Sequence, residues 1–219
     1  NHIPSGFIKK RLKYILYPYI FMNVVYAFTN NDSISVSSVI SESLKNIFLG
    51  ESTVYFVLIV FQFYLLHVFF YKKLNQWNPK IVLISTLIIN IGYLAFFNFV
   101  DAPNNLIGSY MWGQGHWIPF LGWLFYFSLG YYAGKYYESL RKRLNSKRTL
   151  ATLIFTTGLF LMIVLVSKYL KIIEVVSSKR IDMLFYTGSI ILLIFSISIL
   201  VNKTPYFMII LSNYSFSIY

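Results

Sequence analysis

The chain has 219 residues, of which 57% are hydrophobic and only 12% are charged, and its mean hydropathy is +0.62. Soluble domains carry about 25% charged residues, so an ordinary soluble domain is excluded. The formal net charge of +12 does not indicate nucleic-acid binding, because the Lys and Arg residues lie at the ends of apolar runs and form no separate basic domain. Cysteine is absent, which excludes disulfides and thiolate metal sites.

Six apolar runs are long enough to cross a bilayer as helices of about 15 to 22 residues. They cover residues 14–29, 54–71, 81–100, 118–137, 149–170 and 183–201, and a seventh begins near Tyr206 and is cut off at Tyr219. Backbone amides in hydrocarbon must be paired internally, and the short alternating segments of a barrel are absent. The runs therefore predict an all-α polytopic transmembrane helical bundle with six full spans and the start of a seventh.

Basic residues are concentrated in three connecting segments, which the positive-inside rule places in the cytosol. These segments hold Lys9, Lys10, Arg11 and Lys13, then Lys72, Lys73 and Lys80, and then Arg141, Lys142, Arg143, Lys147 and Arg148. Segments 30–53 and 101–117 contain few or no cations and should face outward. Segment 171–182 is an exception, because it must also face outward yet contains Lys171, Lys179 and Arg180.

A short amphipathic helix is predicted in the first outer segment, over residues 34–50. Its apolar residues recur at helical spacing, Ser33 or Ser35 can cap its start, and Gly50 can end it. Such a helix is expected to lie on the outer membrane surface. An ordinary interfacial helix is the favoured interpretation, and a lid over an outward cavity is the alternative.

Polar residues within the spans are candidate site residues, because each is costly in lipid without a partner. They are Asn23, Gln62, His67, Asn90 and Ser128, and no Asp or Glu lies in the core of a span. The lack of carboxylates argues against a proton- or sodium-coupled transporter. Asn23 and Asn90 are predicted to hydrogen-bond across helices. His67 is a weak candidate for a catalytic base, and a helix-end histidine bonded to a carbonyl is its commoner role.

A second candidate site lies in the outer segment 110–117. Gln114, His116 and Trp117 combine hydrogen-bonding groups with an aromatic ring, as sugar-binding surfaces do. An interfacial aromatic belt explains Trp117 equally well. It explains Gln114 and His116 less well, so these three residues are the candidate acceptor-binding residues.

A third candidate site is the basic cluster of Lys9, Lys10, Arg11 and Lys13, four cations in five residues at a cytosolic helix start. Arg and Lys pair strongly with phosphate, so this cluster can hold a polyphosphate such as the nucleotide part of acyl-CoA. The alternative is that the cluster only contacts anionic lipid and sets the topology, and the residues alone favour that alternative. Neither a metal site nor a bound cofactor is expected.

Four stretches, in order along the chain, resemble the membrane-bound acyltransferase 3 family. Residues 7–19 resemble the Lys-Arg-Leu-Lys-Arg-Ile-Leu-Pro-Pro-Tyr of its third helix, 55–66 its Trp-Phe-Leu span, 120–134 its Phe-x-x-Gly-x-x-x-Gly helix, and 211–219 its Ser-Phe-x-Ile-Tyr. Two departures are Tyr14, where the family often has a second Arg, and Tyr55, where it has Trp. Within the family, the likeness is closest to members assigned to export or O-acylation of the biofilm polysaccharide poly-N-acetylglucosamine.

The resemblance implies about ten spans of roughly 20 residues each and acylation of glycans outside the cell from a cytosolic donor. It assigns donor contact to Lys10, Arg11 and Lys13, and a catalytic His and Arg to a first helix that this chain lacks. On this view residues 1–219 are one transmembrane domain of an internal fragment, without its N-terminal and C-terminal helices. Such a chain is a multi-pass protein of the bacterial plasma membrane.

The resulting hypothesis is an O-acyltransferase that transfers an acyl group from cytosolic acyl-CoA to a cell-surface or extracellular polysaccharide. Its expected partners are membrane lipids, the polysaccharide acceptor, acyl-CoA and a polysaccharide synthase complex, with no nucleic acid. Two alternatives stay open: an exporter or flippase that moves poly-N-acetylglucosamine without acylating it, and a purely structural subunit of a synthase.

Overall fold

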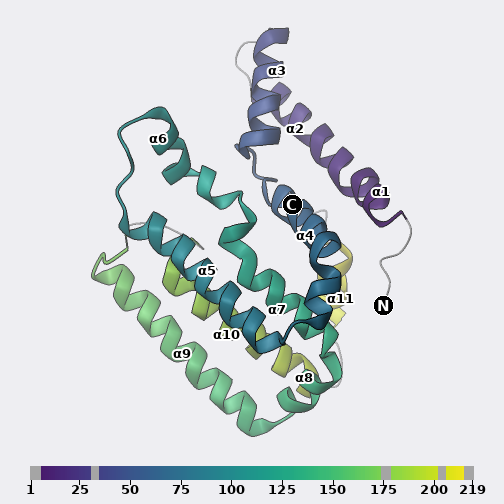
Figure 1. The fold of residues 1–219 in the computed structure, drawn as a ribbon, viewed down its shortest axis with the longest axis vertical. Coiled ribbons are helices and arrows are strands. Elements are labelled where there is room, and N and C mark those ends of the chain that lie inside the picture. Colours follow the sequence, from purple (N-terminus) through teal and green to yellow (C-terminus); the bar gives the residue numbers. More distant parts are fainter. Residues whose placement is uncertain (1–5, 31–34, 174–178, 202–205, 215–219) are drawn as a thin grey trace. The chain divides into compact units, whose positions relative to one another are not determined.

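The computed structural model describes residues 6–30, 35–173, 179–201 and 206–214, and all regular structure in those ranges is helical (Figure 1). The described chain forms two compact units, Asn1–Leu129 and Gly130–Tyr219. Residues 31–34, 174–178 and 215–219, which fall in segments that entered the predictions above, lie outside the described residues.

Unit 1 contains helical segments near its start, the long helices α4 (Phe56–Gln76) and α5 (Pro79–Phe99), and an irregular segment before α7. Its elements are α1 (Phe7–Arg11), a π turn η1 (Leu12–Leu16), α2 (Tyr17–Thr29), α3 (Val36–Leu44), a π turn η2 (Lys45–Leu49), α4 (Phe56–Gln76), α5 (Pro79–Phe99), α6 (Leu106–Gly113), two 3-10 turns η3 (Gly115–Trp117) and η4 (Phe120–Trp123), and the start of α7 (Leu124–Lys135). Unit 2 contains the end of α7, α8 (Tyr137–Leu144), α9 (Lys147–Tyr169), α10 (Ile181–Leu200) and α11 (Tyr206–Tyr214).

Within the described residues, four helices are long and apolar enough to cross a membrane: α4, α5, α9 and α10. They coincide with the predicted runs 54–71, 81–100, 149–170 and 183–201. The other predicted runs are not single helices of that length. A π turn interrupts run 14–29, run 118–137 begins with a 3-10 turn, and the helix at Tyr206 has nine residues. The prediction of six spans and the start of a seventh is therefore not confirmed as a count.

The amphipathic helix predicted at 34–50 is present as α3 followed by η2. Ser35 caps its start by accepting a hydrogen bond from the Ser38 amide at 3.1 Å, and Gly50 ends it at a φ of +64°, which is left-handed and favours glycine. The Tyr19 hydroxyl of α2 donates to the Asn46 and Ile47 carbonyls at 3.2 and 3.0 Å. Apolar residues at a spacing of four stay exposed along one side: Val36, Ile40, Leu44 and Phe48. This exposed stripe is what an interfacial helix presents to lipid.

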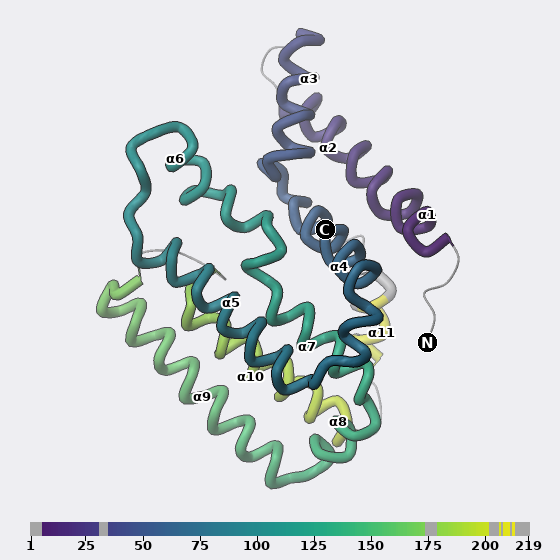
Figure 2. Tube along the Cα trace, in the orientation of Figure 1, coloured from purple at the N-terminus to yellow at the C-terminus, as the bar shows by residue number. Residues whose placement is uncertain are grey.

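In unit 2, α9 and α10 lie side by side as a hairpin (Figures 1 and 2). The Arg180 guanidinium donates to both Asp182 carboxylate oxygens, at 3.0 and 2.6 Å, and to the Ser167 hydroxyl at 3.0 Å. The Arg180 side chain is buried, and hydrogen bonding to Asp182 raises the pKa of its guanidinium. The pair is neutral overall, so Arg180 adds little to the positive charge of this outer segment. Segment 171–182 therefore carries less net positive charge than its three cations suggest, which reduces its conflict with the positive-inside rule.

Candidate functional site

The basic cluster meets the middle of α4 through an aromatic ring. The Phe7 ring centroid lies 5.7 Å from that of Tyr64 and 6.2 Å from that of His67, and His67 lies 6.2 Å from Tyr71. The Arg11 guanidinium carbon lies over two of these rings, 5.0 Å from the centroid of Phe7 and 4.8 Å from that of Tyr64. A guanidinium stacks well on aromatic faces, so Arg11 is held against α4.

Arg11 differs from the lysines around it. Lys9, Lys10 and Lys13 are exposed, whereas Arg11 is half-buried. Its Nε atom is buried and has no hydrogen-bond partner among the described residues. A buried donor of this kind costs about 1 to 3 kcal/mol unless an acceptor reaches it. Arg11 is therefore the cation of the cluster that is best placed to receive an anionic group.

Two predicted candidates are brought together here. Arg11 is a predicted donor-binding residue and His67 a weak candidate for catalysis, and no sequence pattern joins the two. In the structure both contact the Phe7 ring, with His67 partly buried on α4. The arrangement can hold an anion beside an imidazole. Whether His67 acts as a base stays a prediction.

The three predicted acceptor-binding residues, Gln114, His116 and Trp117, do not all lie at the surface. His116 is only 2% exposed, and its ring stacks on that of Phe97 with centroids 4.7 Å apart. Its Nδ1 lies 2.7 Å from the Met111 carbonyl oxygen. A carbonyl only accepts, so this nitrogen carries the proton. Gln114 and Trp117 are half-buried, and the Trp117 ring faces Tyr55 at 6.0 Å. In this cluster, Gln114 and Trp117 reach the surface and His116 lies inside.

Side-chain bonds to backbone carbonyls hold the outer segment in place. The Tyr110 hydroxyl donates to the Leu49 carbonyl at 2.9 Å, and burial together with the Glu51 carboxylate raises the pKa of this tyrosine. The Trp112 indole donates to the Val100 carbonyl at 2.6 Å. Gly115 is packed so tightly that an added Cβ would lie 2.6 Å from the Tyr110 ring. Helix α6 is therefore bonded both to the end of η2 at Leu49 and to the end of α5 at Val100.

Between α6 and α7 the backbone is broken at Pro119, and an amide from α4 bridges the break. The Gln62 Nε2 donates to the Ile118 carbonyl at 2.9 Å, and its Oε1 accepts from the Phe120 amide at 2.9 Å. Proline has no N–H, and the extended backbone at Pro119 prevents a regular helix from continuing. Gln62 thus replaces the hydrogen bonds that the break removes.

A second amide, from α5, does the same one turn further along. The Asn90 Nδ2 donates to the Gly122 carbonyl at 3.0 Å, and its Oδ1 accepts from the Phe125 amide at 3.3 Å. The Trp123 indole donates to the Trp117 carbonyl at 2.8 Å. Irregular backbone is tolerated at membrane depth only where its polar groups are satisfied within the protein. Residues 114–123, called here the broken segment, meet that condition through α4 and α5.

The predicted cross-helix role is confirmed for Asn90, whose partner is backbone and not another side chain. It is wrong for Asn23, whose Nδ2 donates to the Tyr19 carbonyl of its own helix at 2.9 Å. Sequence reasoning assigned no role to Gln62. The available signals were Pro119 inside an apolar run and two amides on neighbouring predicted spans. Within the described residues, no group of three or more His, Asp or Glu side chains is arranged to hold a metal ion.

The fold and these contacts define a helical membrane protein in which a broken segment packs against two spanning helices. Residues 2–219 match the model of the family described as "Acyltransferase domain". The match covers nearly the whole chain, so the chain belongs to this acyltransferase family, which is the family that the four stretches indicated.

Relatives agree with the family. The chain is 36% identical over 223 residues to "Putative membrane-bound acyltransferase YfiQ" of Bacillus subtilis, a match that covers 99% of this chain and 60% of that protein. It is 33% identical over 133 residues to "Probable poly-beta-1,6-N-acetyl-D-glucosamine export protein" of Staphylococcus aureus, covering 60% of this chain and 37% of the relative. The protein of the same name in Staphylococcus epidermidis is 30% identical over 166 residues, covering 75% of this chain and 46% of the relative.

The chain thus spans about 60% or less of the length of these relatives. No solved structure matches it. Family membership and the four apolar helices identify a multi-pass membrane protein of bacteria.

Proposed function

We propose that this chain is part of an integral membrane O-acyltransferase that moves an acyl group from cytosolic acyl-CoA to a cell-surface or extracellular polysaccharide. The observation that carries the proposal is the family match over residues 2–219. The acceptor class is supported by relatives named for poly-β-1,6-N-acetyl-D-glucosamine export.

The donor end of the reaction is assigned to Arg11 and the exposed lysines beside it. The nucleotide part of acyl-CoA carries phosphates, and an arginine at a dry boundary binds phosphate through two parallel N–H bonds. Arg11 is held over the Phe7 and Tyr64 rings, and its buried Nε–H donor has no acceptor among the described residues. Lys9, Lys10 and Lys13 then add a diffuse positive field that attracts the anion.

The acceptor end is assigned to Gln114 and Trp117, with His116 as a positioning residue. A partly exposed indole can stack on the apolar face of a sugar, and the Gln114 amide can bond its hydroxyls. Buried His116 ties Met111 to the ring of Phe97 and so fixes the loop that presents both residues.

In the reaction, an acceptor hydroxyl oxygen attacks the thioester carbonyl carbon. A new C–O bond forms, the C–S bond breaks, and the hydroxyl proton passes through a base to the departing CoA thiolate. His67 is the candidate base among the described residues. The resemblance places the catalytic His in a helix outside this chain, so the two assignments differ in a testable way.

A second candidate function is polysaccharide export without acyl transfer. It is favoured by the name shared by the staphylococcal relatives, "Probable poly-beta-1,6-N-acetyl-D-glucosamine export protein". Acylation and export predict different phenotypes, because only an exporter is needed for a glycan that never carries esters.

The experiment compares cells with and without the full-length gene and measures, by NMR, both the amount of secreted polysaccharide and its ester content. The acyltransferase predicts that deletion removes esters while the amount of glycan changes little. Lost secretion of a glycan that carries no ester in either strain would contradict the proposal and favour the exporter. Complementation with the intact gene should restore the ester signal and serves as the control.

A further inference from the structure

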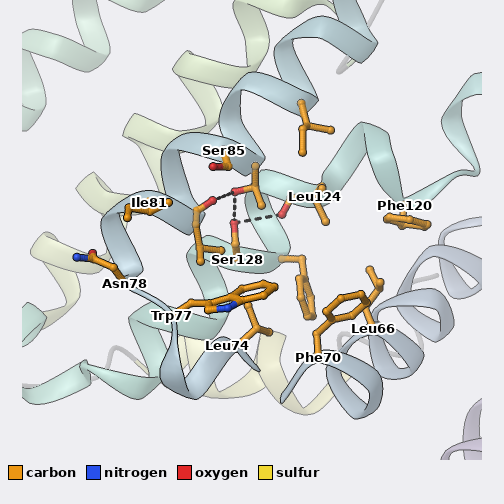
Figure 3. Close-up of a pocket in the computed structure, with 14 residues that line it drawn as sticks. Leu66, Phe70, Leu74, Trp77, Asn78, Ile81, Ser85, Phe120, Leu124 and Ser128 are labelled. Carbon is orange, nitrogen blue, oxygen red and sulfur yellow. Dashed lines mark hydrogen bonds between the residues drawn. The ribbon is translucent and has the colours of Figure 1, made fainter. Parts of the chain in front are cut away.

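A cavity of about 540 Å³ lies in unit 1 between α4, α5 and the start of α7 (Figure 3). Ligand pockets typically have volumes of about 300 to 1,000 Å³, so this one can hold a sizeable group. It is formed entirely by residues of unit 1 and takes no part in the contacts that hold Arg11 or the outer cluster.

The wall of the cavity is apolar. Aromatic and aliphatic side chains form it, among them Phe70, Leu74, Trp77, Ile81 and Phe127. Figure 3 shows Trp77 and Phe70 on either side of its lower edge and Ile81 on the α5 side. Phe70, Trp77 and Ile81 are exposed to the outside of the unit, so the cavity is open along one side.

The polar groups of the lining are largely occupied by the protein itself. The Thr86 and Ser128 hydroxyl oxygens lie 2.6 Å apart, so one of them donates to the other. The hydroxyl that accepts can donate to a carbonyl of its own helix, that of Val82 at 2.8 Å for Thr86 or that of Phe125 at 2.9 Å for Ser128. Asn78 accepts from the Lys80 amide at 3.0 Å. Ser85 adds one more hydroxyl at the exposed side of α5. Such a lining suits a hydrocarbon group and not a sugar or a nucleotide.

The cavity has the depth of one membrane leaflet. On α5 its lining runs from Ile81 to Ile89, and the eight steps between them rise about 12 Å along a helix. Half of a typical hydrocarbon core is about 15 Å. The cavity begins at the turn between α4 and α5, which the basic residues place at the cytosolic surface.

The mouth of the cavity carries uncompensated positive charge. Lys72, Lys73 and Lys80 are exposed around the turn, and the Lys73 ammonium lies 5.9 Å from the centroid of the Phe70 ring that lines the cavity. The sequence from Ser52 to Val100 contains no Asp or Glu. An apolar cavity beside exposed ammonium groups complements a molecule with a hydrocarbon chain and an anionic head.

We propose that this cavity binds one acyl chain of an anionic phospholipid of the cytosolic leaflet, with the lipid phosphate held by Lys73 and Lys80. Lysines near an anionic membrane surface contribute about 1 kcal/mol each, and their alkyl stems can lie along the lipid while the ammonium stays in water. Depth, apolar lining and charge at the mouth all agree with this occupant.

The acyl chain of the proposed donor is an alternative occupant with similar chemistry, but none of the residues that line the cavity belongs to the contacts that hold Arg11. On α4 the cavity is lined by Leu66, Phe70 and Leu74, whereas the contacts to the Arg11 region are made by Tyr64 and His67. At about 100° per residue the lining set is centred roughly 90° around α4 from Tyr64 and His67, and His67 lies in the sector next to Leu74. The lipid site and the proposed donor site thus use different side chains of α4, and lipid binding in the cavity does not depend on acyl transfer.

The test uses the full-length protein in nanodiscs with phospholipid probes that carry a photoactivatable diazirine on one acyl chain. Phosphatidylglycerol and phosphatidylcholine probes with the same chains are compared, and labelled peptides are mapped by mass spectrometry. We expect labelling in the peptides that contain Phe70, Trp77 and Ile81, with about a tenfold preference for phosphatidylglycerol. Equal labelling by the two lipids would overturn the head-group assignment.

Two variants test binding of the lipid acyl chain and binding of the lipid head group separately. Ser85→Trp fills the open side of the cavity and should abolish the labelling, whereas Ile84→Trp, at an exposed neighbour outside the lining, should not. The double variant Lys73→Gln/Lys80→Gln keeps the cavity and should lower phosphatidylglycerol labelling to the phosphatidylcholine level. Labelling that survives both changes would overturn the proposal, and the surface double variant keeps the test valid if Ser85→Trp does not fold.

A long-chain acyl-CoA carrying the same diazirine supplies the last arm. If it labels the cavity peptides and excess phosphatidylglycerol does not displace it, the cavity belongs to the donor and the lipid assignment is wrong. If it labels only peptides near Arg11, the two sites are separate as proposed. The outcome is independent of ester transfer, so failure here leaves the proposed function untouched.

Discussion

The α4–α5 pair of unit 1 and the α9–α10 hairpin of unit 2 have similar lengths and hydropathy but use their polar residues differently. In unit 1, Gln62 and Asn90 bond the backbone of the broken segment. In unit 2, Ser189 and Ser198 bond carbonyls of their own helix, Ser196 bonds the Leu144 carbonyl at the end of α8, and Arg180 pairs with Asp182 at the start of α10. The irregular backbone of the broken segment is thus held by side chains of α4 and α5 in unit 1.

Irregular backbone in lipid is tolerated only where it is buried in protein or lines a cavity. Unit 1 holds such a segment, the Arg11 contacts and the lipid-chain cavity. The hairpin of unit 2 is regular, and its buried ion pair closes it at one end. The proposed binding sites all lie in unit 1, and the hairpin of unit 2 carries none of them.

The largest effect is expected from breaking the ion pair of unit 2. Arg180→Met leaves the Asp182 carboxylate buried without its cation, which typically costs about 3 to 5 kcal/mol. The double variant Arg180→Met/Asp182→Leu removes both charges and should recover most of that loss. Unfolding in detergent titrated with SDS measures both. A double variant as unstable as the single one would show that the pair does more than balance charge.

A smaller effect, confined to the broken segment, is expected from Asn90→Leu. The change removes the bonds to Gly122 and Phe125 and leaves buried backbone groups without partners, at about 1 to 3 kcal/mol. Hydrogen exchange should rise in peptides of residues 114–125. Ser198→Ala on exposed α10 is the matched control and should change stability by less than about 0.5 kcal/mol. Increased exchange throughout α9 and α10 would contradict a local role.

The smallest effect is a pH dependence at Lys179, which lies outside the spanning helices and is 6% exposed. Burial lowers the pKa of Lys179 to about 8, below its value in the unfolded chain. The unfolded state then binds more protons between about pH 8 and the unfolded pKa, so stability should rise as pH increases through this window. Lys179→Met should flatten the rise, and Lys168→Met, an exposed lysine of the same hairpin, should leave it. An unchanged slope in Lys179→Met would refute the assignment.

Much of the fold was predictable because hydropathy and helix-capping residues depend only on the local sequence. The four long spans follow from hydropathy, and Ser35 and Gly50 mark the ends of the outer helix through their ordinary capping chemistry. Both depend on local composition, so one sequence suffices to find them.

The broken segment was not predictable in the same way. Residues 118–137 have the composition of a span, and the only local warning is Pro119. The break is maintained by Gln62 and Asn90, which lie 56 and 32 residues from the carbonyls they bond. The burial of His116 depends likewise on Phe97 in another helix. Such pairings are tertiary, and hydropathy carries no information about them.

The most direct test of the central claim is the ester content of the secreted polysaccharide in cells whose full-length protein carries Arg11→Met. Arg141→Met, an exposed arginine of α8, is the control with the same loss of charge. At equal membrane levels, we expect Arg11→Met to lower ester content at least about tenfold, as for loss of a hydrogen-bonded charge contact, and Arg141→Met to retain it. Unchanged ester content in Arg11→Met would contradict the assignment of the donor site to this arginine.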